Sequence, residues 1–430
     1  SGGTNQVALT WNAPAGGAGS YNIYRATTTG VTKLTGADAG AATSTSFTNT
    51  DLASGTPYYY VVTAVNAYGE SDESFEVFAT PTSAGAPGTP DTTFNGGGFA
   101  THNDAGGEGS AERALAVAIS SAGSIYAVGE AQGVSENLDM IVWAFLPDGG
   151  LDSSFGGAGF VSSSNVAGGN GIDTASSLAI DSTGRVLVVG YSYNLSNNYD
   201  IVVWRYNANG TLDTTFGPGA TGFVVYNSNF AGAVSHDYGM GVAIDSAGRI
   251  VVVGRSYVGA PTSYDGVILR LTDGGVLDST FGTGGASFYN ASTGGNNWDL
   301  MSDLAFTATG EMIVAGSSRR GVNLDDATLW KVLPDGGLDS TFGTAGVFKH
   351  SGLSASAFTV ARGLVIDGTG RIVMAGYSTV SPDPSAAMLW RVTPSGALDT
   401  TFNDAGFVAW TGTASGAAYF TGLAIDSAGR

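Results

Sequence analysis

Carboxylate side chains recur at two fixed positions along most of this chain. The first set lies seven residues before a repeated Ile or Phe and consists of Glu112, Asp173, Asp237 and Asp299. The second set lies four residues before a repeated Trp or Leu and consists of Asp139, Asp200, Asp265 and Asp326. The next copy has Thr359 and Ala386 instead, so it lacks both acids. This joint loss indicates that the two positions serve one local purpose.

Two purposes fit these carboxylates. Each can accept backbone N–H groups where a strand begins, which is a common role for a repeated Asp. Two carboxylates can also hold a cation together with carbonyl groups of the loops, and such oxygen ligands suit Ca²⁺. The sequence therefore leaves two interpretations open, a structural carboxylate at each position or a Ca²⁺ site between strands.

Aromatic residues in the most variable segments form a second candidate group. Tyr193, Tyr199, Tyr238 and Trp298 lie near Asn and Gly in stretches that differ from copy to copy. Rings of this kind present an apolar face and a polar edge, so they can stack on sugars beside amide groups. They can equally pack beneath their own loops. Trp298, in the stretch GGNNWDL, is the residue that we expect to contact a ligand.

Other catalytic chemistry has less support in the sequence. The chain has no Cys and no GxSxG motif, so nucleophilic triads lack their usual signature. His102 and His350 occupy matching positions in copies that are not adjacent, which argues against a paired metal site. Acidic pairs are abundant, and they leave a glycoside hydrolase or a lyase open.

The composition limits the classes of partner. The 430 residues include 16 basic and 36 acidic side chains, for a net charge of −20. Such a charge excludes generic nucleic-acid binding and argues against binding to anionic membranes. The 67 glycines, with many Tyr, Phe, Val and Thr, suit short strands joined by tight turns. Apolar stretches such as RIVVVG are too short to span a bilayer, so we expect no transmembrane segment.

Residues 1–85 have the pattern of an antiparallel sandwich. VALTWNAP (Val7–Pro14), YNIYRAT (Tyr21–Thr27) and GTPYYYVVTAVNAYGESDES (Gly55–Ser74) alternate apolar and polar residues with period two. We expect Trp11 at the centre of this sandwich. The LxW start, the YxIYR strand and the AVNxxGES ending resemble a fibronectin type III domain. The resemblance implies that Tyr58 is the residue of the tyrosine corner. A Pro/Gly/Ala linker, PTSAGAPGTP, follows.

Residues 86–430 are built from a repeat of about sixty residues. The anchor LDSSFGGAGFV (Leu151–Val161) recurs as LDTTFGPGATGFV, LDSTFGTGGASF, LDSTFGTAGVF and LDTTFNDAGFV. Each unit contains four apolar segments of strand length, separated by turns such as DSTGR (Asp181–Arg185). Four short strands in each repeat favour a β-propeller of about six or seven blades over a helical solenoid. The motifs resemble the bacterial delta-60 repeats, which implies a surface-associated protein.

The sixth copy ends at TGLAIDSAGR (Thr421–Arg430), just after its first strand. We therefore expect a propeller that is truncated in its sixth repeat. Either the chain given stops early, or a neighbouring subunit donates the missing strands. The stretch PDTTFNGGGFA (Pro90–Ala100) is a candidate for the outer strand of the last blade. The start at Ser1 rather than Met indicates a processed or excerpted chain.

The parity of the strands separates two faces of this propeller. The turns between first and second strands, and between third and fourth strands, are short and lie on one face. The other loops are long and different in every copy, so we expect any binding site on their face. Five arginines lie on that long-loop side, where a clamp for an anion would be placed: Arg113, Arg255, Arg319, Arg320 and Arg362. Of the two interpretations, an anion clamp or scattered surface charges, we favour scattered surface charges.

Together these features predict an all-β protein from the outside or the surface of a bacterium. We expect a structural or adhesive role, with a filament or surface-layer subunit as one form of it. The expected partners are further copies of the chain, other surface proteins and glycans. A carbohydrate-active propeller enzyme and a glycan-binding, lectin-like module are the alternatives.

Overall fold

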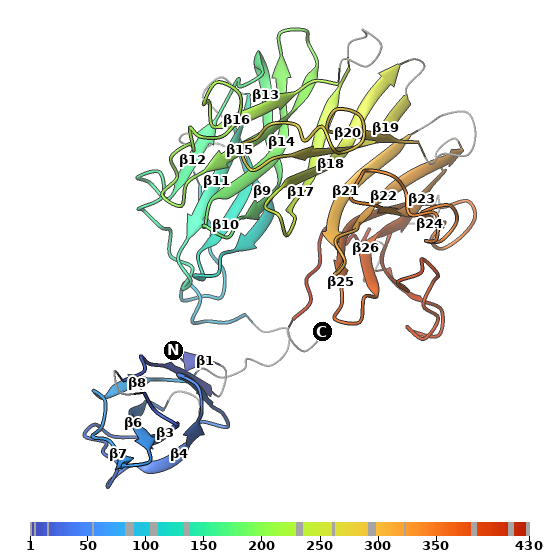
Figure 1. Ribbon diagram of the computed structural model, residues 1–430. Helices are drawn as coiled ribbons and strands as arrows, with labels where there is room; N and C mark the ends of the chain where they lie inside the picture. Colours follow the sequence, from blue (N-terminus) through green and yellow to red (C-terminus); the bar gives the residue numbers. More distant parts are fainter. Residues whose placement is uncertain are drawn as a thin grey trace. The chain divides into compact units, whose positions relative to one another are not determined.

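The computed structural model describes two compact units, Ser1–Phe99 and Ala100–Arg430. The described ranges are 2–3, 6–14, 17–53, 56–81, 90–103, 111–132, 137–228, 235–259, 263–290, 298–321, 324–379, 385–411 and 417–426. Both units are made of strands and turns (Figure 1). Within the described ranges, no helix is long and apolar enough to cross a membrane.

The first unit is a sandwich of two antiparallel sheets. One sheet contains β1 (Gly2–Gly3), β2 (Gln6–Thr10) and β5 (Ser46–Asn49). The other contains β4 (Ala37–Ala42), β3 (Ser20–Ala26), β6 (Tyr58–Asn66), β7 (Gly69–Glu70) and β8 (Val77–Ala79). Val7 of the first sheet and Ile23 and Tyr60 of the second share one buried core. The alternating pattern of the sequence therefore buries one face of each sheet against the other.

Two aromatic residues of this unit were singled out by the sequence. The hydroxyl group of Tyr58 accepts a hydrogen bond from the backbone N–H of Ala53 at 3.1 Å, five residues upstream. This is the bond expected of a tyrosine corner. Trp11 is only partly buried and meets the edge of Tyr21 at 5.2 Å between ring centroids. Tyr60, rather than Trp11, is the fully buried ring of the core.

The described residues of the second unit form five antiparallel sheets of four strands, one for each complete repeat. Blade one contains β9 (Glu112–Ile119), β10 (Ile125–Gln132), β11 (Leu138–Phe145) and β12 (Phe160–Ser163). Blade two contains β13 (Gly168–Ile180), β14 (Val186–Asn194), β15 (Tyr199–Tyr206) and β16 (Phe223–Tyr226). Blade three contains β17 (Asp237–Ile244), β18 (Ile250–Gly259), β19 (Ser263–Leu271) and β20 (Ala286–Tyr289). Blade four contains β21 (Asp299–Phe306), β22 (Met312–Gly321), β23 (Leu324–Val332) and β24 (Val347–His350). Blade five contains β25 (Phe358–Ile366), β26 (Ile372–Thr379), β27 (Ala386–Val392) and β28 (Phe407–Trp410).

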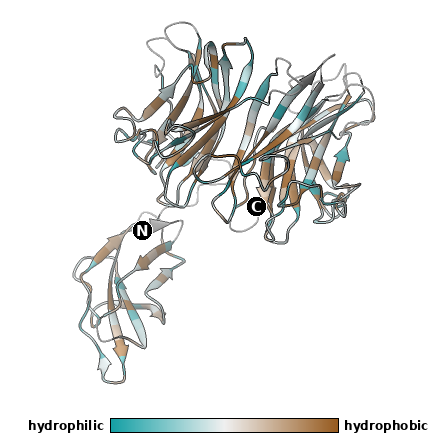
Figure 2. Ribbon diagram, turned by 45° about the horizontal axis from the view of Figure 1, so that its top comes forward, coloured by the Kyte–Doolittle hydropathy of each residue, from teal (hydrophilic) through white to brown (hydrophobic). Residues whose placement is uncertain are grey.

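The hydrophobic cores lie between successive blades. Val128 and Val142 of blade one share a buried cluster with Val188 and Val202 of blade two. The same arrangement joins blades two and three, three and four, and four and five. Because the middle strands are covered on both sides, they are apolar along most of their length, as the hydropathy colouring shows (Figure 2). This explains why runs such as VLVV do not alternate.

The described part of the sixth copy, residues 417–426, lies beside blade five. The backbone N–H of Ala418 donates to the carbonyl of Ser385, and that of Phe420 donates to the carbonyl of Gly376. The residue of blade four that is equivalent to Ala418 is Asp299. Its neighbour Trp298 forms a β-bridge with Tyr264 of blade three. Residues 417–426 form no strand, so the predicted first strand of the sixth copy is not found among the described residues, although the segment lies where a first strand would pair. Among the described residues between Ala79 and Glu112, including 90–100, there is no strand.

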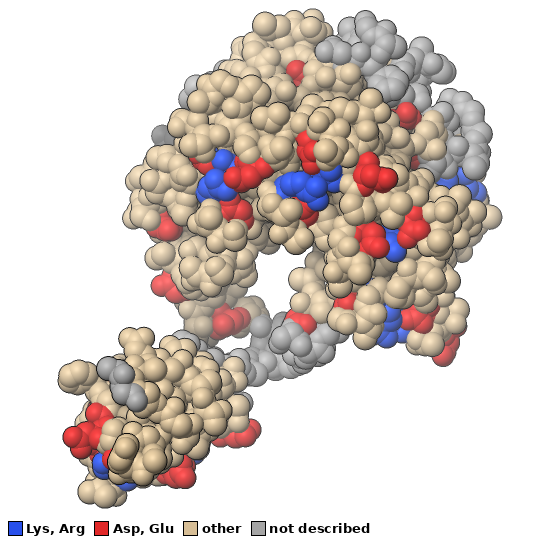
Figure 3. All heavy atoms as spheres, viewed as in Figure 1, with Lys and Arg blue, Asp and Glu red and all other residues tan. Residues whose placement is uncertain are grey.

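Charged residues of the short-turn face connect neighbouring blades. The Arg205 side chain is 1% exposed, and its Nε donates to Oδ2 of Asp213 at 2.8 Å. Its guanidinium carbon lies 4.5 Å from the ring centroid of Phe216, and its Nη1 bonds Asp273 of the next blade at 2.9 Å. Arg270, Lys331 and Arg391 pair with their own repeat Asp residues at 2.8, 3.0 and 2.7 Å. Figure 3 shows basic side chains next to acidic ones on the surface of the second unit.

Candidate functional site

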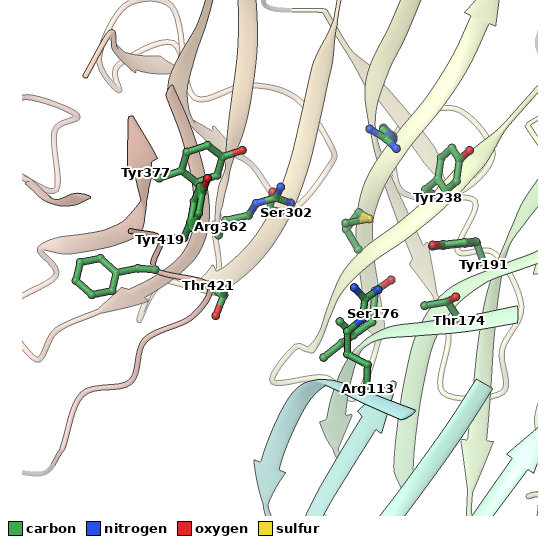
Figure 4. Close-up of a pocket in the computed structure, with 14 residues that line it drawn as sticks. Arg113, Thr174, Ser176, Tyr191, Tyr238, Ser302, Arg362, Tyr377, Tyr419 and Thr421 are labelled. Atoms are coloured by element: carbon green, nitrogen blue, oxygen red, sulfur yellow. The ribbon is translucent and has the colours of Figure 1, made fainter. Parts of the chain in front are cut away.

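A cavity of about 600 Å³ lies at the centre of the second unit. Its lining comes from the first strands of all five blades, from second strands and from the sixth copy. Figure 4 shows Tyr377, Tyr419 and Arg362 on one side of this space, and Arg113 and Tyr238 on the other. The volume falls within the range of roughly 300–1,000 Å³ that is usual for ligand sites.

A β-bulge in every first strand places one residue in the cavity. In β25, Ala361 pairs with Gly376 and Gly363 pairs with Ala375, so Arg362 is an extra residue without a partner across the ladder. The same shift occurs at the same position in the other four blades. A bulge re-aims side chains at the edge of a sheet. All five bulge residues line the cavity, namely Leu115, Ser176, Met240, Ser302 and Arg362.

Two further positions of each repeat line the cavity in several blades. The first-strand position two residues before the bulge contributes Arg113, Thr174, Tyr238 and, in the sixth copy, Tyr419. The second-strand position directly after the repeated glycine contributes Tyr191, Arg255 and Tyr377. The residue type differs between blades at all of these positions, although the surrounding repeat is regular. The backbone is therefore repeated, whereas the chemistry of the cavity wall is not.

Three arginines from blades one, three and five line the cavity. The interpretation of these arginines as scattered surface charges is wrong, because the propeller brings blades that are distant in sequence around one axis. Arg113 donates to Glu130 at 2.6 Å, and Glu130 also accepts a hydrogen bond from Thr174. Arg255 lies over the rings of Tyr238 and Tyr264, at 4.6 and 5.0 Å from their centroids.

The remaining two arginines of the long-loop side do not line the cavity. Arg319 pairs with Asp325 at 2.9 Å and covers the ring of Trp298 at 4.2 Å. Arg320 pairs with Asp326 at 2.6 Å. These two side chains are neutralised by acids of their own blade.

The four aromatic residues predicted to contact a ligand belong to one continuous chain of rings. Tyr193 contacts Tyr199 at 5.3 Å, and Tyr199 contacts Tyr238 at 5.4 Å between centroids. Tyr238 contacts Tyr264 at 6.3 Å, and Tyr264 contacts Trp298 at 5.4 Å. The chain crosses blades two, three and four and reaches the cavity at Tyr238. Burial raises the pKa of the Tyr199 and Tyr238 hydroxyls, so both phenols are neutral at physiological pH.

The predicted carboxylates meet across blade boundaries. The charge of Asp139 in blade one contributes to the raised pKa of Asp173 in blade two, and Asp237 in blade three does the same for Asp200 in blade two. Within blade two, Ser192 of the middle strand lies between Asp173 and Asp200 in the ladder. In these two cases the acid of the third strand therefore acts on the first-strand acid of the next blade.

Burial raises the pKa of these carboxyl groups. Desolvation brings the pKa of Asp173 and of Asp200 to about 6, and it raises the pKa of Asp139, Asp237 and Asp265 as well. Hydrogen bonds to the carboxylates partly offset this rise in pKa. Oδ2 of Asp173 accepts the backbone N–H of Asn165 at 2.8 Å, and Oδ2 of Asp237 accepts that of Ser228 at 2.9 Å.

The other acidic candidates have different surroundings. Asp326 pairs with Arg320, and the first-strand position of the next blade is Thr359, which bonds Ser378 at 3.0 Å. Glu112 lies 3.7 Å from Nδ1 of His102. Asp299, on the first strand of blade four, is fully buried. The acid on the third strand of the preceding blade is Asp265. Among the described residues, no three Asp, Glu, His or Cys side chains come together as a metal-binding group. The Ca²⁺ site stays a prediction that rests on pairs of carboxylates.

The two matching histidines accept hydrogen bonds from tryptophans of the repeat. Nε1 of Trp143 donates to Nδ1 of His102 at 3.3 Å, and Nε1 of Trp390 donates to Nδ1 of His350 at 3.1 Å. In blades two and four the equivalent indole groups, of Trp204 and Trp330, are buried without a hydrogen-bond partner. The histidines therefore satisfy buried donors, and neither lines the cavity.

The comparisons with known proteins match the two units separately. A family described as a domain of unknown function, DUF5122 β-propeller, matches residues 182–216, 248–281 and 368–402, and the fibronectin type III family matches residues 1–80. A poly(3-hydroxybutyrate) depolymerase of Ralstonia pickettii is 43% identical over 82 residues, which are 19% of this chain and 15% of that enzyme. The chain thus spans only a small part of the length of this curated relative.

Two solved structures are similar to separate parts of the chain. A fibronectin-III-like protein from Clostridium thermocellum is 38% identical over 19% of this chain and 82% of its own, with a TM-score of 0.17. The RS223 β-xylosidase is 11% identical over 66% of this chain and 96% of its own, with a TM-score of 0.31. From its family matches, the chain consists of a fibronectin type III domain followed by repeats of the DUF5122 β-propeller family.

Proposed function

We propose that this protein is an extracellular bacterial adhesive protein whose propeller binds a carbohydrate on its long-loop face. One observation carries the proposal, the chain of aromatic rings from Tyr193 to Trp298 that reaches the central cavity at Tyr238. Rings that are partly buried keep a fixed orientation, and they can stack on the apolar faces of sugars.

The polar groups around the rings suit hydroxylated ligands. The cavity wall includes the hydroxyl groups of Thr174, Ser176, Ser302 and Thr421. Ser302 Oγ is buried and has no hydrogen-bond partner. A buried polar group without a partner is costly, and a bound hydroxyl group would satisfy it. Such groups next to aromatic rings are the usual composition of a sugar site.

Binding is favoured over carbohydrate cleavage by the charges in the cavity. Glycoside hydrolysis uses two carboxyl groups on either side of the scissile bond. The described lining of the cavity contains no Asp, Glu or His. Asp173 and Asp237, which have raised pKa values, are fully buried between blades. Burial raises the pKa of the Tyr238 hydroxyl, so the phenol stays protonated and no phenolate is present to act as a base.

The location and the wider role belong to the same proposal. A net charge of −20 supports solubility outside the cell, and a fibronectin type III domain is a common spacer in extracellular proteins. The domain is shared with a bacterial enzyme that acts, by its name, on a polymer. Self-association and binding to other surface proteins remain compatible with a glycan-binding propeller.

The test is a binding screen of the full chain against soluble and insoluble polysaccharides, followed by Trp298→Ala. Loss of a stacking residue at a binding site should weaken binding about tenfold or more. Trp410→Ala is the matched control, because Trp410 is 56% exposed on the outer strand of blade five. Absence of binding to every glycan, or equal binding by the Trp298 variant, would contradict the proposal. Release of new sugar ends or unsaturated products would favour the enzyme.

A further inference from the structure

We infer that the central cavity recognises an oxyanion group on the bound saccharide, a carboxylate or a sulfate ester, through Arg113, Arg255 and Arg362. This inference rests on the proposed carbohydrate function and adds the chemical class of the ligand. The three guanidinium groups come from blades one, three and five and line one cavity of about 600 Å³.

The charge of two of these arginines, Arg255 and Arg362, is not compensated by an acid among the described residues. Every other described arginine of the second unit forms an ion pair with an acid, as in Arg205–Asp213 and Arg371–Asp367. Among the described residues, Arg255 and Arg362 form no ion pair, and Arg113 shares Glu130 with Thr174. The described wall of the cavity contains no acid. The centre of the propeller is therefore basic, although the whole chain has a net charge of −20.

Arg255 is held in a fixed orientation. Its guanidinium group lies over the rings of Tyr238 and Tyr264. Its Nε is buried and has no hydrogen-bond partner in the part of the chain that the structure describes. A planar guanidinium group with unused donors matches the two oxygens of a carboxylate or the oxygens of a sulfate ester. Because stacking on the rings already fixes the Arg255 side chain, less side-chain entropy is lost when it binds an oxyanion.

The rest of the cavity wall indicates that the oxyanion is part of a saccharide. A small inorganic anion needs only donors, whereas this wall also presents Tyr191, Tyr377 and Tyr419. Tyr377 and Tyr419 meet edge to face at 4.8 Å. The unpaired Ser302 Oγ lies in the same cavity as the unpaired Arg255 Nε. Rings, hydroxyl groups and guanidinium groups together fit an acidic sugar residue.

The experiment measures binding of the full chain to three probes by isothermal titration. The probes are polygalacturonate, which carries carboxylates, dextran sulfate, which carries sulfate esters, and neutral dextran. We expect an acidic probe to bind at least tenfold more tightly than neutral dextran, and the affinity to fall with added salt. Arg255→Met and Arg362→Met should each weaken that binding about tenfold to hundredfold, because each removes charge-assisted hydrogen bonds. Arg255→Lys should recover only part of it, since an ammonium group cannot bond two oxygens in a plane.

Arg371→Met is the matched control, because Arg371 pairs with Asp367 in a short turn away from the cavity. Unchanged thermal melting verifies the fold of each variant, and the Arg362 variant keeps the test valid if the Arg255 variant does not fold. Binding of neutral dextran that is insensitive to the cavity arginines would overturn the oxyanion inference and leave the carbohydrate proposal standing. Absence of binding to all glycans would overturn both. The probe that loses affinity on substitution of the arginines distinguishes a carboxylate from a sulfate ester.

Discussion

Gly190 of β14 lies so close to Thr174 of β13 that a Cβ atom on the glycine would be 1.7 Å from the threonine carbonyl oxygen. The same relation, at 1.8 to 1.9 Å, holds in the other four blades at Gly129, Gly254, Gly316 and Gly376. In each case the β-bulge of the first strand brings its carbonyl over the glycine. The repeated glycine is therefore a steric requirement of the bulge that shapes the cavity wall.

Substitution of this glycine should destabilise the propeller. We expect Gly190→Ala to lower the free energy of unfolding by about 2–3 kcal/mol or more, because the backbone of either strand must shift to admit the methyl group. Denaturant unfolding measures the change. The control is Gly368→Ala, where no atom lies within 4 Å of the new methyl group. Equal stability of the two variants would mean that the bulge adapts without cost.

The buried arginine of the short-turn face should contribute far more stability than an exposed one. Arg205→Met leaves Asp213, which is 6% exposed, without its main partner, and should cost about 3–5 kcal/mol. Arg371→Met breaks a pair whose arginine side chain is 39% exposed, and should cost at most about 1 kcal/mol. Calorimetric melting of both variants checks the difference. A small loss of stability in Arg205→Met would show that this side chain does not contribute much to the contact between the blades.

The buried carboxyl groups should make the propeller less stable as the pH rises. The pKa of Asp173 is about 6 in the folded protein and near its usual 3.8 in the unfolded chain. The folded state therefore binds more protons between these pH values, and its stability falls as the pH rises through this window. Asp173→Asn removes this dependence.

The stability of Asp173→Asn relative to the unchanged protein should increase between pH 4 and pH 6, by on the order of 2 kcal/mol. Melting temperatures at pH 4, 5, 6 and 7 provide the measurement. Asp404→Asn, at an exposed position, is the control. A constant difference for Asp173→Asn would mean that its carboxyl group titrates normally.

Calcium should stabilise the protein if the carboxylate pairs hold a cation. Among the described residues, Oδ1 of Asp173 and Oδ1 of Asp265 are buried without hydrogen-bond partners, which leaves them available as ligands. We expect the melting temperature to fall when a chelator is added and to recover with excess Ca²⁺. Asp200→Asn should reduce this shift. Identical melting temperatures with and without the chelator would contradict the cation site. The structural role of the carboxylates would then be the remaining interpretation.

Much of the architecture follows from the sequence because it depends on local, repeated signals. The turn DSTGR predicts a hairpin, and in the structure Asp181 Oδ1 accepts the backbone N–H of Thr183 at 2.8 Å while Gly184 has a φ of 84°. The anchor phenylalanines predict a repeating core, and Phe155, Phe216 and Phe281 are fully buried. Strand order within each blade is also local, since consecutive antiparallel strands need only short connections.

The sequence contained a signal for the cavity that was easy to overlook. The residue after the repeated glycine is Glu130, Tyr191, Arg255, Ser317 or Tyr377, although the residues before it are regular. Variation in a regular strand marks a position that does not serve the scaffold. The loops indicated Trp298 as the ligand contact, whereas Arg255 and Arg362 were interpreted as surface charges.

The sequence by itself determined the two kinds of domain, the strands of each repeat and the residues that are equivalent between blades. Only the tertiary structure decided which equivalent residues face one another. Asp139 meets Asp173 across a blade boundary, and Arg113, Arg255 and Arg362 surround one cavity although they lie far apart in the chain. Periodicity defines position within a sheet, whereas these contacts depend on how the sheets pack around the axis and on bulges that redirect single side chains.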